Sequence, residues 1–191
     1  MKKSLWMVGL ILSFNALAAD TYVIDTAHSS IAFSVKHMAI SNVKGHFSEF
    51  SGTIVYDPED ASQFKADGAI TVKSIDTGIV GRDEHLRSPD FFDIEKYPEI
   101  RFAAKKVERQ GAVYSLTGDL TMHGVTKEIT LPFTVTGPIV DMQGKKRIGL
   151  ETSTVINRKD YGINWSKLMD NGGLVVADDV KAEINIEAVK E

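Results

Sequence analysis

Hydrophobic and polar residues alternate with a period of two along most of the chain from Thr21 onward. The clearest runs, each with an apolar residue at every second position, are residues 31–35, 70–72, 114–122, 129–135, 148–156 and 180–186. Successive side chains of a β-strand point to opposite faces of the sheet, so this pattern predicts strands that are buried on one face. We expect about eight strands and little helix.

Pairs of turn-forming residues fall between these runs. Asp57-Pro58, Gln110-Gly111, His123-Gly124 and Gln143-Gly144 each stand where a strand should reverse direction. Many short strands joined by tight turns are typical of a sandwich or a barrel. A closed barrel is favoured because closure removes the exposed edges of the sheet. We therefore predict an all-β fold: one extended antiparallel β-barrel over residues 19–191.

Two segments interrupt the alternation. Residues 80–98 carry helix-forming charged residues around Leu86 and predict a short helical insertion of one or two helices between strands. Residues 160–178 hold Trp165, Leu168 and Met169 and predict an irregular connection before the last strand. Neither segment resembles a linker, so the prediction of a single domain stands.

The N-terminus has the order of a Sec-type signal peptide. Lys2 and Lys3 precede the apolar residues 5–14, and Ala16-Leu17-Ala18 supplies small residues for cleavage after Ala18, with cleavage after Ala19 as the next choice. A membrane anchor is the alternative, but the apolar run is about half of the roughly 20 residues that a spanning helix needs. Residues 1–18 thus predict an exported protein. No later segment is apolar enough over a sufficient length to span a bilayer.

The charge and the cysteine content exclude several kinds of partner and site. Without Lys2 and Lys3, the 22 basic residues fall to 20, against 26 acidic ones, a formal charge of −6. This balance argues against nucleic acid, or an anionic membrane, as the main partner. The chain has no cysteine, which excludes disulfides, thiolate nucleophiles, thiolate metal sites and lipoprotein acylation.

Three blocks of sequence together resemble the YceI family. The first block comprises DTAHS at residues 25–29, FSVKHM at 33–38 and VKGHF at 43–47. The second is RDEHLRSPDFFD at residues 82–93 with Tyr97-Pro98, and the third is GDLTMHGVT at residues 118–126. The match covers nearly the whole mature chain in the order of the family, and the signal peptide and length resemble those of periplasmic members.

The resemblance implies a lipocalin-like barrel with a long interior cavity in the periplasm. It further implies a polyisoprenoid ligand, such as an isoprenoid quinone, or a related fatty amphiphile. The family offers no established catalytic residues to carry over. We therefore expect a lipid carrier with no cofactor other than such a bound lipid.

Candidate ligand-binding residues come from the inward faces and from the two irregular segments. Barrels of about eight strands can be filled or hollow, and periodicity does not distinguish them. Gly45, Gly52, Gly68 and Gly118 fall within strand patterns, where glycine often marks a bend or a close approach. The aromatic residues of the insertion either line the cavity mouth or cap the core. The candidates are Phe33, Val35, His37, Phe47, Leu86, Phe91, Phe92, Tyr97, Phe102, Leu116, Leu120, Phe133 and Trp165.

Polar candidates at the mouth are Arg82, His85 and Arg87. The alternative is a solvated helix face on which these residues pair with Asp83 and Glu84.

No catalytic or metal-binding motif occurs in the sequence. His28, His37 and His46 are spaced by nine residues, which matches no common ligand pattern, so we predict no metal site. Two alternatives to a carrier remain: a lipid-modifying enzyme that uses the same cavity, and a filled barrel with a structural or stress-related role. Delivery to a membrane redox protein and formation of a homodimer stay open.

Overall fold

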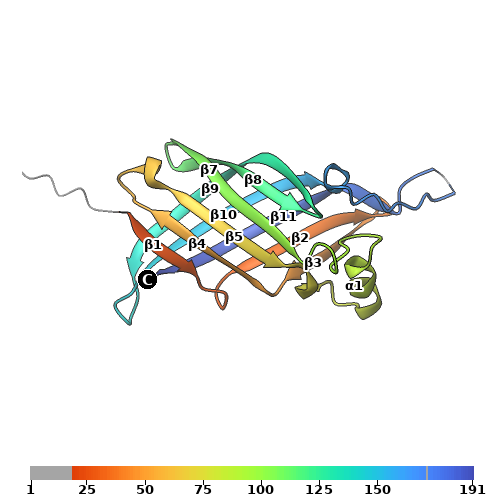
Figure 1. Ribbon diagram of the computed structural model, residues 1–191, viewed down its shortest axis with the longest axis horizontal. Helices are drawn as coiled ribbons and strands as arrows, with labels where there is room; N and C mark the ends of the chain where they lie inside the picture. Colours follow the sequence, from red (N-terminus) through yellow and green to blue (C-terminus); the bar gives the residue numbers. More distant parts are fainter. Residues whose placement is uncertain (1–18, 171) are drawn as a thin grey trace, which may run out of the picture.

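The computed structural model describes residues 19–170 and 172–191, so the predicted signal peptide at residues 1–18 lies outside the described residues (Figure 1). The strands are β1 (Asp20–Ile24), β2 (Ser30–His37), β3 (Ser41–Phe47), β4 (Phe50–Tyr56), β5 (Lys65–Thr71), β6 (Ile75–Asp76), β7 (Glu99–Gln110), β8 (Val113–Met122), β9 (Val125–Val140), β10 (Lys146–Asn157) and β11 (Val176–Lys190). The helical elements are α1 (Val80–Arg87) and the 3-10 turns η1 (Ala61–Gln63), η2 (Val72–Ser74) and η3 (Arg158–Tyr161).

The strands close into an elongated antiparallel barrel (Figure 1). In the described part of the chain the ring has eight members, β1, β4, β5, β7, β8, β9, β10 and β11 in that order. The ring closes because β11 pairs with β1, with Ile24 opposite Ala188. This confirms the all-β barrel that the alternating pattern predicts.

Three further strands extend the wall of the barrel at one end. β2 follows β1 along β11, β3 pairs with β2, and β6 pairs with β3. Each continues a ring strand after a short break, at residues 25–29, 48–49 and 72–74. Long strands with local irregularities bend more readily than regular ones, which lets the wall curve around the interior.

The end of the barrel where β1 begins and β11 ends, here called the terminal end, is packed with aromatic side chains. The ring of Phe133 lies 5.1 Å from that of Phe64 and 5.0 Å from that of Tyr114, centroid to centroid. Tyr22 is 1% exposed. The Tyr56 and Tyr114 hydroxyls lie 3.4 Å apart, and burial raises the pKa of Tyr56. These contacts fill this end of the tube.

The opposite end, here called the helix end, carries the insertion predicted at residues 80–98. The insertion forms one α-helix, α1, followed by turns up to Pro98. Buried Asp83 holds the helix in place by accepting hydrogen bonds from the Thr77 backbone N–H, at 2.9 Å, and from the Thr77 hydroxyl. Phe91 packs with Val72, Ile75 and Ile163 in a second core cluster at this end.

The predicted turns lie where strands reverse. His123 and Gly124 join β8 to β9 with φ angles of 50° and 75°, as a two-residue hairpin of type I′ requires. A side chain at Gly124 would collide with the ring of Tyr97, whose Cε1 atom lies 2.5 Å from the Cβ position. Within residues 19–170 and 172–191, no helix is long and apolar enough to cross a membrane.

Candidate ligand cavity

An apolar cavity of about 310 Å³ lies inside the barrel between the two packed ends. Its wall includes every second residue from Leu150 to Ile156 on β10 and from Val180 to Ile186 on β11. At about 3.3 Å per residue, each of these stretches covers about 20 Å of strand. The volume lies at the lower end of the range of about 300–1,000 Å³ for small-molecule sites. The cavity therefore suits an elongated molecule.

The inward side chains of β2, β10 and β11 are only half-buried, although they face the interior. They lie against empty space, whereas the side chains at the two ends lie against other side chains. The barrel is therefore hollow in its middle and filled at its ends. The half-buried residues in question are Ile31, Phe33, Val35, Thr152, Thr154, Ile156, Val180, Ala182 and Ile184.

The four strand glycines differ in what they do for this cavity. Gly68 lies on its wall, and a Cβ there would have one neighbour within 4 Å, the Ser51 carbonyl oxygen at 3.6 Å. At Gly52, opposite Gly68, a Cβ would lie 2.5 Å from the Asp67 carbonyl oxygen. Gly68 thus widens the cavity, whereas Gly52 permits a close approach of two backbones.

The helix end of the cavity is covered by the insertion and by residues 158–165. Leu86, Phe91 and Phe92 of the insertion line the cavity. The ring of Trp165 packs on Phe91 at 5.2 Å and on His85 at 5.3 Å, centroid to centroid. This cover consists of a short helix and an irregular segment rather than of the barrel strands.

Arg158 fastens the second half of the cover to the barrel. The side chain is 5% exposed and lines the cavity. Its guanidinium donates to the carbonyl oxygens of Ile163 at 2.8 Å and Trp165 at 2.7 Å, and to that of Ala177 at 3.1 Å. It also pairs with the Asp178 carboxylate at 2.8 Å. One buried cation therefore ties residues 163–165 to the start of β11.

Most of the predicted ligand-binding residues line the cavity. Those that do so are Phe33, Val35, Phe47, Leu86, Phe91, Phe92, Phe102, Leu116, Leu120 and Phe133. Three do not. His37 lies beyond the cavity near the β2–β3 turn, Tyr97 packs on His123 at 4.7 Å, and Trp165 covers Phe91 from outside.

The three predicted polar residues also lie away from the cavity wall. Arg82 donates to the Thr77 hydroxyl and carbonyl, Arg87 donates to the carbonyls of Lys73 and Ile75, and His85 pairs with Asp90 at 2.8 Å. They stabilise the insertion instead. They do not pair with Asp83 and Glu84, as the alternative interpretation expected: Asp83 binds Thr77.

Sequence reasoning missed Arg158, a buried charged residue on the cavity wall. The signal was present, because residues 152, 154, 156 and 158 follow one another at every second position from an inward face. A charged residue at an inward-facing position of an apolar strand is unusual, and its charge requires a partner inside the barrel.

The cavity offers little acid–base chemistry. Among the described residues that line it, the charged ones are Asp67 and Arg158. Asp67 is exposed on the outward face of β5, and Arg158 is bound to Asp178. Thr152 donates its hydroxyl hydrogen to the Pro132 carbonyl oxygen at 2.7 Å. The arrangement can bind an apolar molecule but positions no general acid or base beside it.

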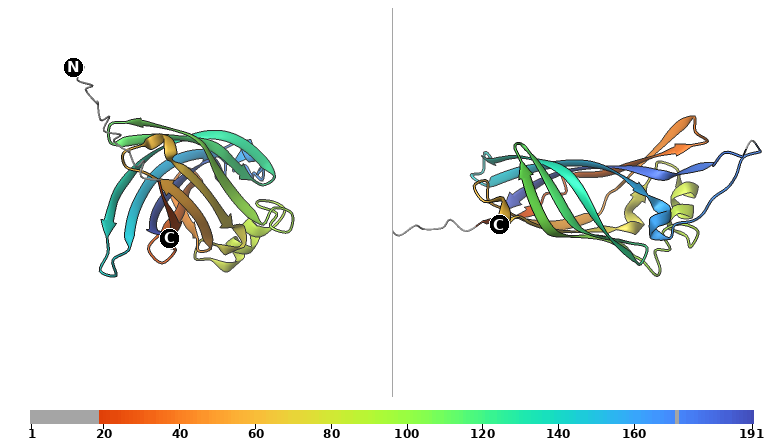
Figure 2. Two further views of the ribbon diagram at one scale, coloured as in Figure 1. Left: turned by 60° about the vertical axis from the view of Figure 1, so that its left-hand side comes forward. Right: turned by 90° about the horizontal axis from the view of Figure 1, so that it is seen from above.

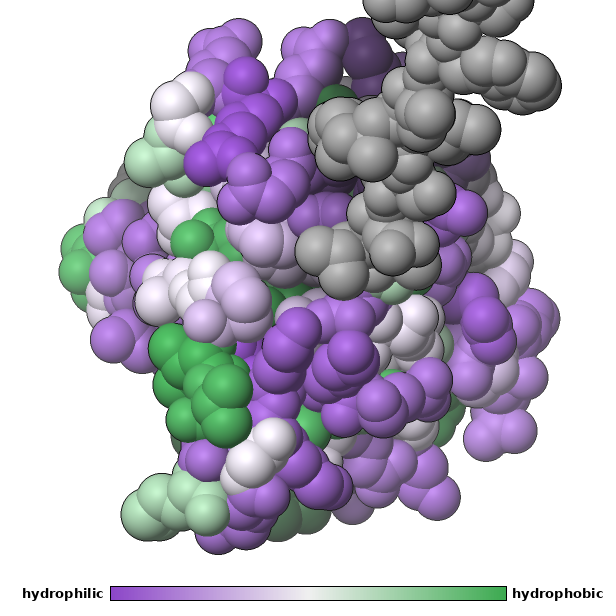
Figure 3. All heavy atoms as spheres, turned by 90° about the vertical axis from the view of Figure 1, so that its left-hand side faces the viewer, coloured by the Kyte–Doolittle hydropathy of each residue, from purple (hydrophilic) through white to green (hydrophobic). Residues whose placement is uncertain are grey.

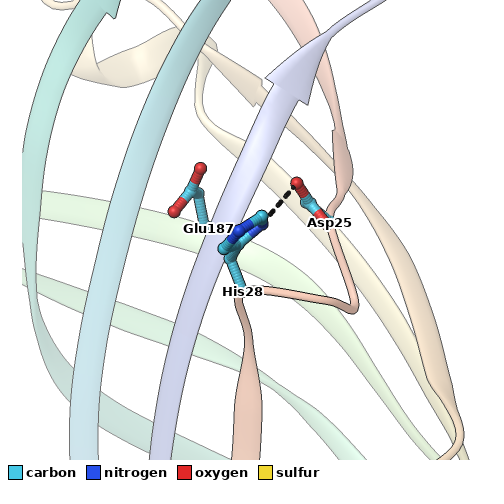
Figure 4. Close-up of side chains that lie close together, drawn as sticks. All are labelled: Asp25, His28 and Glu187. Carbon is cyan, nitrogen blue, oxygen red and sulfur yellow. Dashed lines mark hydrogen bonds and ion pairs between the residues drawn. The ribbon is translucent and has the colours of Figure 1, made fainter. Parts of the chain in front are cut away.

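A separate group on the outer surface, Asp25, His28 and Glu187, brings three side chains with metal-ligating atoms together (Figure 4). The Arg147 guanidinium already lies between the two carboxylates, 2.7 Å from Asp25 and 2.6 Å from Glu187, and it also pairs with Asp141 at 2.7 Å. Arg147, with a further contribution from His28, lowers the pKa of Asp25 to about 2. This group is an ion-pair network in which arginine supplies the positive charge.

Comparison with known proteins identifies a family to which this chain is similar. The family model of the YceI-like domain matches residues 22–188. A UPF0312 protein of Staphylococcus aureus (strain MSSA476) is 37% identical over 167 residues, which cover 87% of this chain and 95% of the relative.

Two solved structures share the fold. The crystal structure of BcnA from Burkholderia cenocepacia has a TM-score of 0.76 and 26% identity, and the match covers 86% of this chain and 98% of BcnA. A polyisoprenoid binding domain from Saccharophagus degradans, implicated in plant cell wall breakdown, has a TM-score of 0.68 at 18% identity over 91% of this chain and 99% of that domain.

Proposed function

The chain belongs to the YceI family, and from this premise we propose that it is a carrier that holds one long-chain lipid, a polyisoprenoid or a fatty amphiphile, in the barrel cavity. The observation that carries the proposal is the row of half-buried apolar side chains on β2, β10 and β11. They leave a hollow of about 310 Å³ in an otherwise packed barrel. Such a hollow gains free energy when an apolar chain fills it.

The chemistry of the wall favours a lipid tail as the ligand. Each buried CH₂ group contributes roughly 0.8 kcal/mol, so affinity grows with chain length and needs few polar contacts. A structural neighbour from Saccharophagus degradans is a polyisoprenoid binding domain, which supports an isoprenoid tail as one class of ligand. We expect weak discrimination between tails of similar length and shape.

A binding role is favoured over catalysis. The described residues of the wall include no pair that could transfer a proton, because Asp67 faces outward and Arg158 is bound to Asp178. A filled barrel with a purely structural role is disfavoured by the cavity itself.

The proposed place of action is the periplasm. The supporting feature is the order of Lys2, Lys3, the apolar residues 5–14 and Ala16-Leu17-Ala18, which is typical of a Sec signal peptide. A carrier in that compartment has membrane lipids as its source and a membrane protein as one class of recipient.

The test is to purify the protein without added lipid, extract it with organic solvent and identify the extract by mass spectrometry. We expect a stoichiometric long-chain lipid. A protein that is empty and also fails to take up an isoprenoid quinone or a long-chain amide in solution would contradict the proposal. The site of action is tested separately by locating the processed chain in cell fractions.

A further inference from the structure

Two hairpins lie side by side at the helix end and project beyond the barrel (Figure 2). One is the turn between β2 and β3, where Met38 and Ala39 have φ angles of 52° and 62°. The other comprises residues 167–170 and 172–175 and is held together by a bridge between Leu168 and Leu174. The Met38 N–H donates to the Val175 carbonyl at 2.9 Å and joins the two. We call residues 36–44 and this second segment the twin hairpins.

The tips of the twin hairpins expose large apolar side chains. Ile40 is 82% exposed, Leu168 66% and Met38 40%. Val35 and Val176, which line the cavity, lie at the base of the same two hairpins. An apolar surface therefore continues from the cavity wall toward the tips, with His37 as a polar residue along the way.

Unpaired cations flank these apolar tips. The twin hairpins carry Lys36, Lys44 and Lys167 against one acidic residue, Asp170, although the whole chain has a net charge of −4. In the part of the chain that the structure describes, none of the three lysines forms an ion pair with another residue. Lys36 and Lys167 thus keep their charges for external anions, whereas Lys44 also acts on Glu183, whose pKa is lowered mainly by Lys181 and to a smaller degree by Lys44.

The terminal end differs in its charges although it also exposes apolar residues, Ile139, Val140 and Met142 (Figure 3). There Lys146 is paired with Asp20 at 2.9 Å and Arg147 is held by three carboxylates, while Lys145 forms no ion pair with another described residue. The aromatic cluster also seals the cavity on that side. Paired cations attract an anionic surface less than unpaired ones, so this end offers less positive charge to headgroups than the helix end.

We propose that the twin hairpins dock the barrel on an anionic lipid bilayer, with Ile40, Leu168 and Met38 entering the interface and the three lysines contacting headgroups. This inference rests on the proposed function, because docking at this end places the cover over the cavity against the source of the lipid. Apolar residues flanked by lysines match the chemistry of such an interface. The negative charge of the rest of the chain confines the contact to this end.

The test is flotation of the protein with vesicles of phosphatidylethanolamine and phosphatidylglycerol, and with vesicles of phosphatidylcholine alone. The test variant is Ile40→Ser with Leu168→Ser, and the matched control at the other end is Ile139→Ser with Met142→Ser. A second variant replaces Lys36, Lys44 and Lys167 by Gln. Burial of one aliphatic side chain changes a binding constant by roughly tenfold or more, and one lysine near an anionic surface by about fivefold.

We expect binding to the anionic vesicles, a loss of at least about tenfold in the hairpin variant, and no loss in the control. The lysine variant should lose most of the preference for anionic lipid. Equal losses in both double variants, or binding only through the terminal end, would overturn the inference. So would a wild-type protein that stays unbound and instead forms a dimer through these hairpins in solution.

Vesicle binding does not require an occupied cavity, so this test is separate from lipid uptake. A protein that binds vesicles but never holds a lipid contradicts the proposed function. A protein that holds lipid but ignores vesicles contradicts the docking surface.

Discussion

The ring of Phe33 occupies the space that a side chain at Gly45, its partner residue across the β2–β3 pair, would need. The same relationship recurs on the opposite wall, where Phe102 Cζ lies 2.6 Å from the Cβ position of Gly118. Each glycine leaves room for an aromatic ring next to the barrel wall. The rings therefore pack on the wall and leave the middle of the barrel empty.

We predict that Gly45→Ala destabilises the barrel by about 1–3 kcal/mol, because the added methyl group collides with the ring of Phe33 and lies 2.9 Å from the Asp76 carbonyl oxygen. The matched substitution Gly68→Ala meets no close neighbour. It should be neutral or raise the free energy of unfolding by up to about 1 kcal/mol, since glycine is unfavourable inside a strand. Urea unfolding of both variants gives the comparison, and equal destabilisation would show that the close contacts at Gly45 are unimportant.

Gly68→Leu should abolish lipid binding without unfolding the protein. The new side chain points into the cavity, where the wall residue now leaves open space. Co-purified lipid is measured by mass spectrometry and stability by thermal unfolding. If the variant is as stable as wild type and still carries a full complement of lipid, the ligand lies elsewhere.

Arg158→Met should lower the free energy of unfolding by about 3 kcal/mol or more, because it removes the donor of three carbonyl groups and one of the two cations that Asp178 binds. Lys159→Met removes the second cation on Asp178. The Lys159 side chain is half-exposed and its ammonium lies 2.8 Å from the Asp178 carboxylate, so its loss should lower the free energy of unfolding by less than about 1 kcal/mol. Limited proteolysis should also cut residues 163–175 faster in the Arg158 variant. Similar behaviour of the two variants would contradict the fastening role of Arg158.

Phe91→Ala should loosen the cover and speed lipid exchange. The deletion removes the ring on which Trp165 packs and costs about 3–5 kcal/mol of stability, as is usual for a buried phenylalanine. The fluorescence of Trp165 should shift to longer wavelength, and transfer of a labelled lipid should become faster. Val155→Ala on the outer surface is the control and should change neither quantity.

Acid should weaken the Arg147 network in a defined pH window. The pKa of Asp25 falls from 3.8 to about 2 in the folded protein, so its contribution to stability is complete above about pH 4 and is lost as the pH falls through 2. Arg147 lowers the pKa of Asp141 in the same direction.

Arg147→Gln should therefore destabilise the protein at neutral pH, and its difference from wild type should shrink as the pH approaches 2. Arg101→Gln, which breaks an exposed pair with Glu99, is the control and should show a small difference at every pH. A difference for Arg147→Gln that stays constant between pH 5 and 2 would exclude the carboxylates as its cause.

Local patterns predicted the strands, the turns and the helical insertion, because alternation and turn residues depend on neighbours along the chain. Those local patterns could not predict whether the barrel is hollow. Gly45 and Gly68 look alike in sequence, yet one lies under Phe33 and the other faces open space. That difference depends on the register between strands, which alternation does not determine.

The positions of the predicted polar residues depend on tertiary contacts in the same way. Arg82, His85 and Arg87 were predicted at the mouth because they lie on a helix beside aromatic residues, but backbone carbonyls of residues 73–77 and Asp90 hold them outside. Arg158 was missed because its partners, Trp165 and Asp178, come close only when the irregular segment folds back on the barrel.

The pairing of β1 with β11 also determines at what point of synthesis the barrel can close. Neither β1 nor β10 has its second neighbour until the final strand has been made, so a growing chain keeps two open sheet edges to the last residues. Contacts between such distant segments form late, so the barrel cannot close before the last strand has been made. On the proposed export route, the chain can pass through a secretion channel before the barrel closes. Closure then takes place on the far side of the membrane.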